Sequence, residues 1–143
     1  MHTYYLDVLN IRENFFSDYV KKIQVTGSEG DLEIFPHHIS LLTSIRPGMV
    51  LLITKFNERK CIYLSGGILE VYCNVVTILA NIAIRGEDID ENRAKKSKER
   101  AERNMKKFRV GCLEYIHASI KFSKALAKLR VIKILKKNFN SIL

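Results

Sequence analysis

The chain has 143 residues, of which 47% are hydrophobic and 27% are charged, which suits one domain with or without an appendage. Its longest apolar run, residues 75–84, contains Thr77 and Asn81 and is much shorter than the roughly 20 residues of a membrane-spanning helix, so none is predicted. The first seven residues have neither a basic segment nor an apolar one. We therefore expect no signal peptide and a chain that stays on the cytoplasmic side.

The formal charge of +9 lies entirely in the second part of the chain. Residues 1–86 hold eight basic and eight acidic residues, whereas residues 87–143 hold sixteen basic and seven acidic ones. This shift predicts a domain boundary at Gly86, with a neutral domain at 1–86 and a basic one at 87–143. A basic surface is typical of a partner that is nucleic acid, an anionic membrane or an acidic protein. The 15 Lys, 17 Ile and 9 Asn leave a second explanation open, namely a compositional bias of the genome.

The neutral domain is expected to consist of short strands separated by turns, because β-branched residues and alternation recur between Gly, Pro and Asn signals. The predicted strands are 22–25, 32–35, 49–56, 61–64, 68–71 and 75–84, and the predicted turns are 27–31, 46–48, 57–60 and 65–67. Short strands without an intervening helix indicate an antiparallel sandwich or barrel. Gly66-Gly67 lacks the spacing of a phosphate loop, so it predicts a bulge or a close approach of two backbones.

Three cysteines, Cys61, Cys73 and Cys112, are odd in number and have no C-x-x-C spacing. They are therefore predicted to be buried, inert thiols rather than zinc ligands or a redox pair.

After Gly86 the periodicity becomes helical. Asp88, with Glu91 three residues later, fits an N-cap arrangement, so a first helix is predicted over residues 87–109. Fifteen of these 23 residues are charged, and the pairs Glu91/Lys95, Glu99/Arg103 and Glu102/Lys106 have i, i+4 spacing. Each such pair contributes only about 0.2–0.5 kcal/mol. The apolar stripe is thin and comprises Ala94, Ala101, Met105 and Phe108.

A turn at Val110-Gly111-Cys112 leads into a second predicted helix. Its apolar residues recur at spacings of 3 and 4, as in a coiled coil: Tyr115, Ala118, Phe122, Ala125, Leu129 and Ile132. The predicted fold is therefore α+β, with an N-terminal antiparallel β-sandwich followed by a C-terminal antiparallel two-helix hairpin. Because the first helix offers few large apolar side chains, we expect the hairpin to detach and reach another partner.

An enzyme is the weakest interpretation, because no Ser/His/Asp set, Cys/His set or acid/base pair of carboxylates is suggested by spacing. His37-His38 lacks carboxylate or Cys partners at suitable spacing, so no metal site is predicted. A nucleic-acid-binding module that uses the basic hairpin is the alternative function. Against it, residues 1–86 are neutral, no RNA-binding aromatic motif is present, and acidic residues are interleaved through the first helix.

Three stretches in order carry a family resemblance: Lys22 to Gly30, Tyr63 to Val71, and Ala83 to Gly86 leading into Ile89 to Ala94. They closely resemble the epsilon subunit of bacterial F-type rotary ATP synthases, and the first resembles the gammaproteobacterial members almost residue for residue. The match extends from about Thr3 to about Lys136.

This resemblance implies a sandwich of about ten strands followed by the hairpin, in a non-catalytic rotor subunit of a proton-translocating ATP synthase. The sandwich would join the gamma subunit to the ring of c subunits. The hairpin would rise along gamma into the alpha/beta catalytic head and block ATP hydrolysis. The chain would then be peripheral, at the cytoplasmic face of the bacterial inner membrane.

The resemblance also implies rotor-contact residues in the sandwich. Asp31 and Glu33, expected in a loop after Gly30, match positions that face the c ring, and His38 matches a position near gamma. Each of these residues, taken alone, is more often simply part of a solvated surface.

The stretch from Ile89 to Ala94 fits the family motif I/L-D-x-x-R-A, whose Asp and Arg help bind ATP on the folded hairpin in several bacteria. Asp90 and Arg93 are therefore nucleotide-binding candidates, together with Arg100, which is seven residues from Arg93 and on the same helical face. No cofactor is required, and ATP would be regulatory. The alternative is a helix-start pair of Asp90 and Arg93 without a ligand, and Ile84 occupies a position that is acidic in some ATP-binding members.

In the extended state, the second helix would place basic residues near an acidic loop of the catalytic beta subunits. The candidates for this inhibitory contact are Lys121, Lys124, Lys128 and Arg130.

Overall fold

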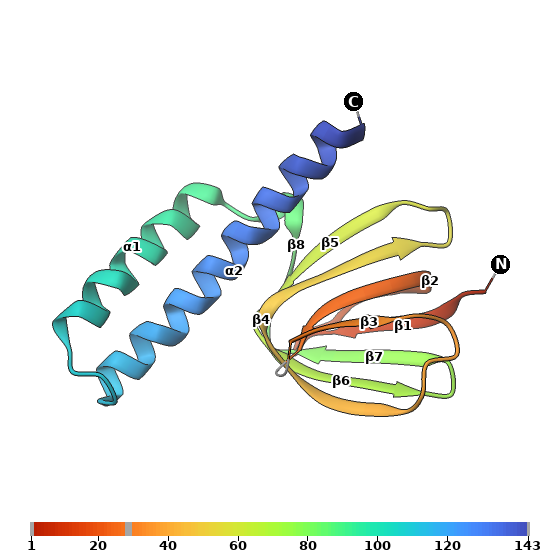
Figure 1. Ribbon diagram of the computed structural model, residues 1–143, viewed down its shortest axis with the longest axis horizontal. Helices are drawn as coiled ribbons and strands as arrows, with labels where there is room; N and C mark the ends of the chain where they lie inside the picture. The colour runs from red at the N-terminus through yellow and green to blue at the C-terminus, as the bar shows by residue number, and fades with distance from the viewer. Residues whose placement is uncertain (1, 28–29, 143) are drawn as a thin grey trace. The chain divides into compact units, whose positions relative to one another are not determined.

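The computed structural model describes residues 2–27 and 30–142, with side chains given up to Lys137. The chain divides into two compact units, residues 1–85 and residues 86–143. The first unit is a β-sandwich and the second is a pair of helices (Figure 1), which confirms the predicted α+β fold class. The sequence placed the boundary one residue later, after Gly86.

Eight strands form the described part of the sandwich: β1 (Tyr4–Leu9), β2 (Asn14–Gly27), β3 (Gly30–Ile34), β4 (Leu41–Thr54), β5 (Arg59–Leu64), β6 (Gly67–Tyr72), β7 (Val75–Ala80) and β8 (Ala83–Arg85). Their order is β3-β2-β1-β7-β6-β4-β5-β8, and an additional β2–β4 pairing closes the sheet on itself. About ten strands were expected. The number is smaller because β2 and β4, with 14 residues each, both serve two sets of partners.

The predicted turn at Arg46-Pro47-Gly48 is wrong, because these residues lie inside β4. β4 pairs with β6 up to Ile45 and with β5 from Gly48 onward, so Pro47 stands where the strand changes partner. At such a point the missing N–H of proline removes no ladder hydrogen bond. Arg46 stabilises the bend by donating its Nε–H to the carbonyl oxygen of Gly27 at 3.0 Å.

The predicted single strand 75–84 is in fact two strands, β7 and β8. β7 pairs with β6 and β1, whereas β8 pairs with β5, so the chain must change direction between them. Ser65 holds this break, because its amide donates to the carbonyl of Ile82 and its hydroxyl accepts from the Ile82 amide, both at 3.0 Å. The β1–β7 pairing is parallel, which departs from the all-antiparallel expectation, and β1 itself was not predicted.

The predicted turn at 27–31 is described only at its two ends. Gly27 and Gly30 pair as the last and first residues of β2 and β3, and Ser28 and Glu29 lie outside the described residues. The predicted close approach at Gly66-Gly67 is confirmed, because a Cβ at Gly67 would overlap the carbonyl oxygen of Leu79.

The sandwich has its own hydrophobic core, built from one face of each strand. Alternation puts Tyr4, Leu6 and Val8 of β1 inside, together with Leu69 and Val71 of β6. The hydroxyl of Tyr4 donates to the carbonyl oxygen of Ile34 at 2.6 Å, so this buried polar group is satisfied.

None of the three cysteines, all of which the structure describes, forms a disulfide, and they differ in burial. Cys61 is buried as predicted, Cys112 is half-buried, and Cys73 is exposed, so the prediction is wrong for Cys73. Cys73 and Asn74 have φ angles of +48° and +61° and form the two-residue turn between β6 and β7. A turn with two positive φ angles matches the twist of a hairpin and projects its residues into solvent.

The second unit comprises a short 3-10 turn, η1 (Gly86–Asp88), and the helices α1 (Glu91–Lys107) and α2 (Leu113–Ile142). The N-cap of α1 is Asp90, whose carboxylate accepts from the amide of Arg93 at 3.1 Å, so the predicted cap at Asp88 is wrong. Asp88 belongs to η1, and the helix begins only after it. The predicted turn between the two helices, at Val110-Gly111-Cys112, is confirmed, and Gly111 has a φ angle of +92°.

The two helices run antiparallel (Figure 1) and meet through small side chains. Ala94 and Ala101 of α1 are buried, as are Ala118 and Ala125 of α2, so the prediction is confirmed for the alanines of both stripes. The large residues predicted beside them are half-buried, Phe108 is exposed, and the fully buried Val131 was not predicted. Alanine lets the helices approach closely but buries little apolar area. The hairpin is therefore held by less hydrophobic stabilisation than the sandwich.

Candidate functional site

The outer side of the sheet exposes apolar side chains in two rows, and the row between them contains Asp7, Thr77 and Glu70 as well as Leu42. We call this surface the apolar sheet face; it consists of Tyr5, Tyr19, Leu42, Ile68, Tyr72, Val75 and Leu79. Leu42 is 70% exposed and Tyr72 is 64% exposed.

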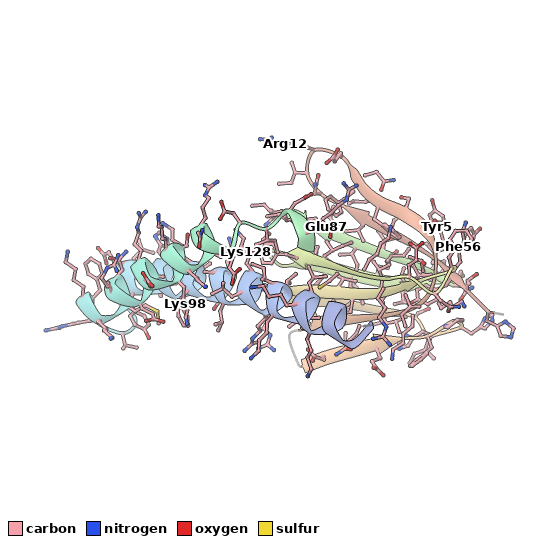
Figure 2. The ribbon with its side chains drawn as sticks, turned by 90° about the horizontal axis from the view of Figure 1, so that it is seen from above. Tyr5, Arg12, Phe56, Glu87, Lys98 and Lys128 are labelled. Atoms are coloured by element: carbon pink, nitrogen blue, oxygen red, sulfur yellow. The ribbon has the colours of Figure 1, made fainter. Side chains whose placement is uncertain are left out.

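Register brings these side chains together. Ile68 lies opposite Leu79, and Tyr72 opposite Val75, across β6 and β7. Tyr5, labelled in Figure 2, lies opposite both Val75 and Tyr19, and its ring meets that of Tyr19 edge-on at 5.2 Å between centroids. Exposed apolar residues that include several tyrosines and are interspersed with polar ones are typical of a protein-binding surface.

Sequence reasoning missed this surface, although a signal was present. Residues 75–80 are apolar at nearly every position, so β7 offers apolar side chains to both sides of the sheet. Strict alternation would have given this strand a polar outer side.

The residues predicted to contact the rotor lie on or just after β3. Asp31 and Glu33 belong to β3 itself and not to a loop, and both side chains are exposed. They are two residues apart, so they share one side of the strand. Glu33 forms an ion pair with Lys22 at 3.1 Å. His38 lies in the connection to β4, where Nδ1 is 2.7 Å from the carbonyl oxygen of Ile39.

One edge of the hairpin is ion-paired. The carboxylate of Glu91 contacts Lys95 at 3.4 Å and Lys136 of α2 at 3.1 Å, and Lys98 contacts Glu102 at 3.8 Å. Hydrogen bonds from the two lysines hold the pKa of Glu91 below its usual range, the one from Lys136 being the larger cause. Of the three predicted i, i+4 pairs, only Glu91/Lys95 occurs among the ion pairs of the described residues.

The other edge of the hairpin gathers like charges. Lys128 of α2 is half-buried, and this burial is the largest cause that lowers its pKa, followed by the charges of Arg93 and Lys124. At 100° per residue, Arg93 and Arg100 lie on the side of α1 away from Glu91 and Lys98. Figure 2 labels Lys98 on α1 and Lys128 on α2. We call Arg93, Arg100, Lys124 and Lys128 the basic edge.

The nucleotide-binding candidates are only partly brought together. Arg93 and Arg100 share one side of α1, whereas the carboxylate of Asp90 is engaged in capping the helix. The structure adds Lys128 and Lys124, which the sequence assigned to the inhibitory contact alone. Arg130, the fourth inhibitory candidate, lies on a different side of α2 from Lys128.

An open groove of about 710 Å³ lies at the base of the hairpin. It is lined by residues of η1, of the start of α1 and of the last part of α2: Gly86, Glu87, Ile89, Glu91, Ile132, Leu135 and Lys136. Its floor is apolar and its rim carries the Glu91–Lys136 ion pair.

Among residues 2–27 and 30–142, no three His, Cys, Asp or Glu side chains are grouped so that they would hold a metal ion. Neither α1 nor α2, as far as the structure describes them, is long and apolar enough to cross a membrane.

Comparisons with known proteins agree with both units. Residues 3–86 match the model of the β-sandwich domain of the ATP synthase delta/epsilon chain, and residues 87–133 match that of its long α-helix domain. A chain of the Euglena gracilis mitochondrial ATP synthase (OSCP/F1/c-ring, rotational state 1) superposes with a TM-score of 0.80 at 20% identity, covering 87% of this chain and 78% of that one. A chain of the Tetrahymena thermophila mitochondrial ATP synthase (central stalk/c-ring) gives a TM-score of 0.58 at 13% identity, covering 90% and 95%.

At these identities the two solved structures show the shared fold alone. The family models, in contrast, together account for residues 3–133 without a gap. The chain therefore belongs to the delta/epsilon family of ATP synthase chains.

Proposed function

We propose that this chain is the epsilon-type rotor subunit of a bacterial, proton-translocating F-type ATP synthase, with its nearest resemblance to gammaproteobacterial members. It is a non-catalytic stalk subunit, as its family is. The sandwich would join gamma to the c ring, and the hairpin would restrain ATP hydrolysis by the alpha/beta head. The chain would be peripheral, at the cytoplasmic face of the inner membrane and held there by the complex.

The observation that carries rotor docking is the apolar sheet face. It stands on strands whose opposite side forms the rigid core, so it is preorganised for binding. We assign this surface to gamma. The exposed carboxylates of Asp31 and Glu33 on β3 would form the contact with the c ring, and His38 would lie near gamma.

Co-purification with gamma tests this assignment. The double variant Tyr72→Lys, Leu79→Lys puts two charges on the apolar sheet face, and burying them would be costly. The matched control, Ile11→Lys, Phe56→Lys, changes two residues that are 77% and 72% exposed outside that face. We expect the control to retain gamma and the double variant to lose it while keeping its circular dichroism spectrum. Equal recovery of gamma by both variants would refute the docking surface.

Inhibition by the hairpin is supported by its light packing, because a seam of alanines separates at a modest cost in free energy. Removal of α2 after Gly111 should raise steady-state ATP hydrolysis by the assembled complex and leave assembly intact. Equal hydrolysis rates with full-length and shortened subunit would show that the hairpin is no brake.

A second proposed function, regulatory ATP binding, is favoured by the basic edge. Arg93 and Lys128 place cationic groups of both helices close enough to affect one another, and a polyphosphate would relieve their repulsion. ATP would then stabilise the closed hairpin. Calorimetric titration with ATP should show binding that Arg93→Gln weakens about tenfold and that Lys106→Gln, an exposed control on a different side of α1, leaves unchanged. Absence of binding by the parent chain would exclude this role.

A further inference from the structure

The last part of α2 is attached to the start of α1 mainly through one carboxylate. Both oxygens of Glu91 accept from the ammonium group of Lys136, at 3.1 and 3.3 Å, and one of them also contacts Lys95 at 3.4 Å. Glu91 is the first residue of α1, where a carboxylate also interacts favourably with the helix dipole.

Apolar packing at this end of the hairpin is incomplete. Ile89, Ile132 and Leu135 line an open groove of about 710 Å³ and do not close over one another. The buried alanines of α1, Ala94 and Ala101, lie one and about three turns further along the helix. Val131 of α2 is fully buried, but after it Ile132 and Leu135 are only half-buried, so the ion pair supplies the directed contact at the end of the described side chains.

α2 continues for six residues past Lys136, to Ile142. The match to the family's helical domain ends at residue 133, so Leu135 and Lys136 lie beyond the part that the family model describes.

We infer that Glu91 and Lys136, with Lys95 beside them, form an ionic latch that keeps the end of α2 on α1, and that the hairpin opens first from this end. When the latch is released, the side chains that line the groove separate next. Because the latch is exposed, it weakens with ionic strength, whereas the alanine seam does not.

Backbone amide exchange in the full chain tests the latch independently of rotor docking and of inhibition. Glu91→Gln and Lys136→Gln each remove one charge at nearly constant helix propensity. We expect each variant to accelerate exchange in residues 128–137 about two- to fivefold, because a helix end without a partner frays. Glu99→Gln and Lys133→Gln remove the same charges from exposed positions on the same two helices and should leave these rates unchanged.

The double variant separates the latch from the helix dipole. If the two residues act on each other, Glu91→Gln with Lys136→Gln accelerates exchange no more than either single change. At about 1 M salt, where the Debye length is about 3 Å, the parent chain should reach the rate of the variants. Additive single effects, or a parent rate that does not respond to salt, would overturn the latch.

Discussion

Two buried tyrosines, Tyr4 in the sandwich core and Tyr63 on β5, make the fold sensitive to alkali. Burial raises the pKa of Tyr63 to about 12. Burial raises the pKa of Tyr4 further, although a hydrogen bond from the backbone of Ile23 acts in the opposite direction. Both groups are therefore neutral in the folded chain at a pH where unfolded tyrosine, with a pKa near 10, is ionised. Stability from each is complete below about pH 10 and is lost as the pH rises through the folded pKa.

We predict that the free energy of unfolding falls between pH 10 and pH 12, by up to about 1.4 kcal/mol per pH unit for each buried tyrosine. Tyr63→Phe should flatten this fall, whereas Tyr72→Phe, a change at an exposed residue, should not. Urea unfolding at several pH values measures the slope. A slope in Tyr63→Phe equal to that of the parent would show that another group controls alkaline unfolding.

Gly67 is required at its position because no side chain fits there. Because a Cβ there would overlap the carbonyl oxygen of Leu79, Gly67→Ala must displace the β6–β7 backbone. We predict a loss of more than about 2 kcal/mol in the free energy of unfolding. Gly111→Ala meets no atom within 4 Å and carries only the strain of its φ of +92°, about 1–2 kcal/mol, so it should be milder. Denaturant curves for the two variants would contradict this assignment if their order were reversed.

At the scale of single elements, the start of α1 shows how one residue decides a helix boundary. Asp90 has extended backbone angles and caps α1, while Asp88 lies in η1. Asp90→Ala should therefore destabilise the hairpin by about 0.5–2 kcal/mol, and Asp88→Ala should have little effect. Amide exchange in residues 91–95 reports the cap directly. Equal acceleration of amide exchange by both substitutions would instead support a helix start capped by Asp88, as the sequence predicted.

The sequence predicted the sandwich, the hairpin and the alanine positions of its seam because each depends on local periodicity. It did not predict features that depend on partners distant in sequence. Pro47 is a turn signal by itself, and only the two different partners of β4 explain why it stands inside a strand. β1 was missed, and its parallel pairing with β7 joins residues about 70 positions apart.

The candidate sites were predicted unevenly for the same reason. Motif residues such as Arg93 could be found from spacing, but its neighbour Lys128 comes from the other helix and is visible only once the hairpin is folded. The apolar sheet face likewise requires the register of β6, β7 and β1. Whether these residues bind gamma, the c ring or ATP stays a prediction.

Across the whole molecule, some basic side chains are already ion-paired and are therefore less available to a partner than others. Lys95 and Lys98 are engaged with Glu91 and Glu102, so one edge of the hairpin is locally neutral, whereas the basic edge has like charges as neighbours. A duplex nucleic acid would have to bind a single narrow stripe next to acidic side chains. This distribution favours a partner that meets one side of α2, such as an acidic protein surface.

The last prediction concerns whether this charge acts in inhibition. Lys121, Lys124 and Lys128 recur at spacings of 3 and 4 on one side of α2. Changing all three to Gln removes charges that an acidic loop of the head would meet. Exposed pairs contribute only about 0.2–1 kcal/mol each, but three together reach the roughly 1.4 kcal/mol that shifts an equilibrium tenfold. The triple change should weaken inhibition of hydrolysis several-fold and flatten its salt dependence.

Lys95, Lys96 and Lys98 changed together to Gln form the control, because two of these charges are already balanced on α1. Lys128→Gln also relieves the repulsion between Lys128 and Arg93 and so stabilises the closed hairpin. The single variant Lys121→Gln therefore isolates the contact with the head. It should also weaken inhibition, but by less than the triple change. ATP hydrolysis by the assembled complex is measured at low and high salt with the parent chain, the two triple variants and Lys121→Gln. If both triple variants inhibit like the parent at both salt concentrations, the charge has no part in the brake, and compositional bias becomes the better explanation of the basic helices.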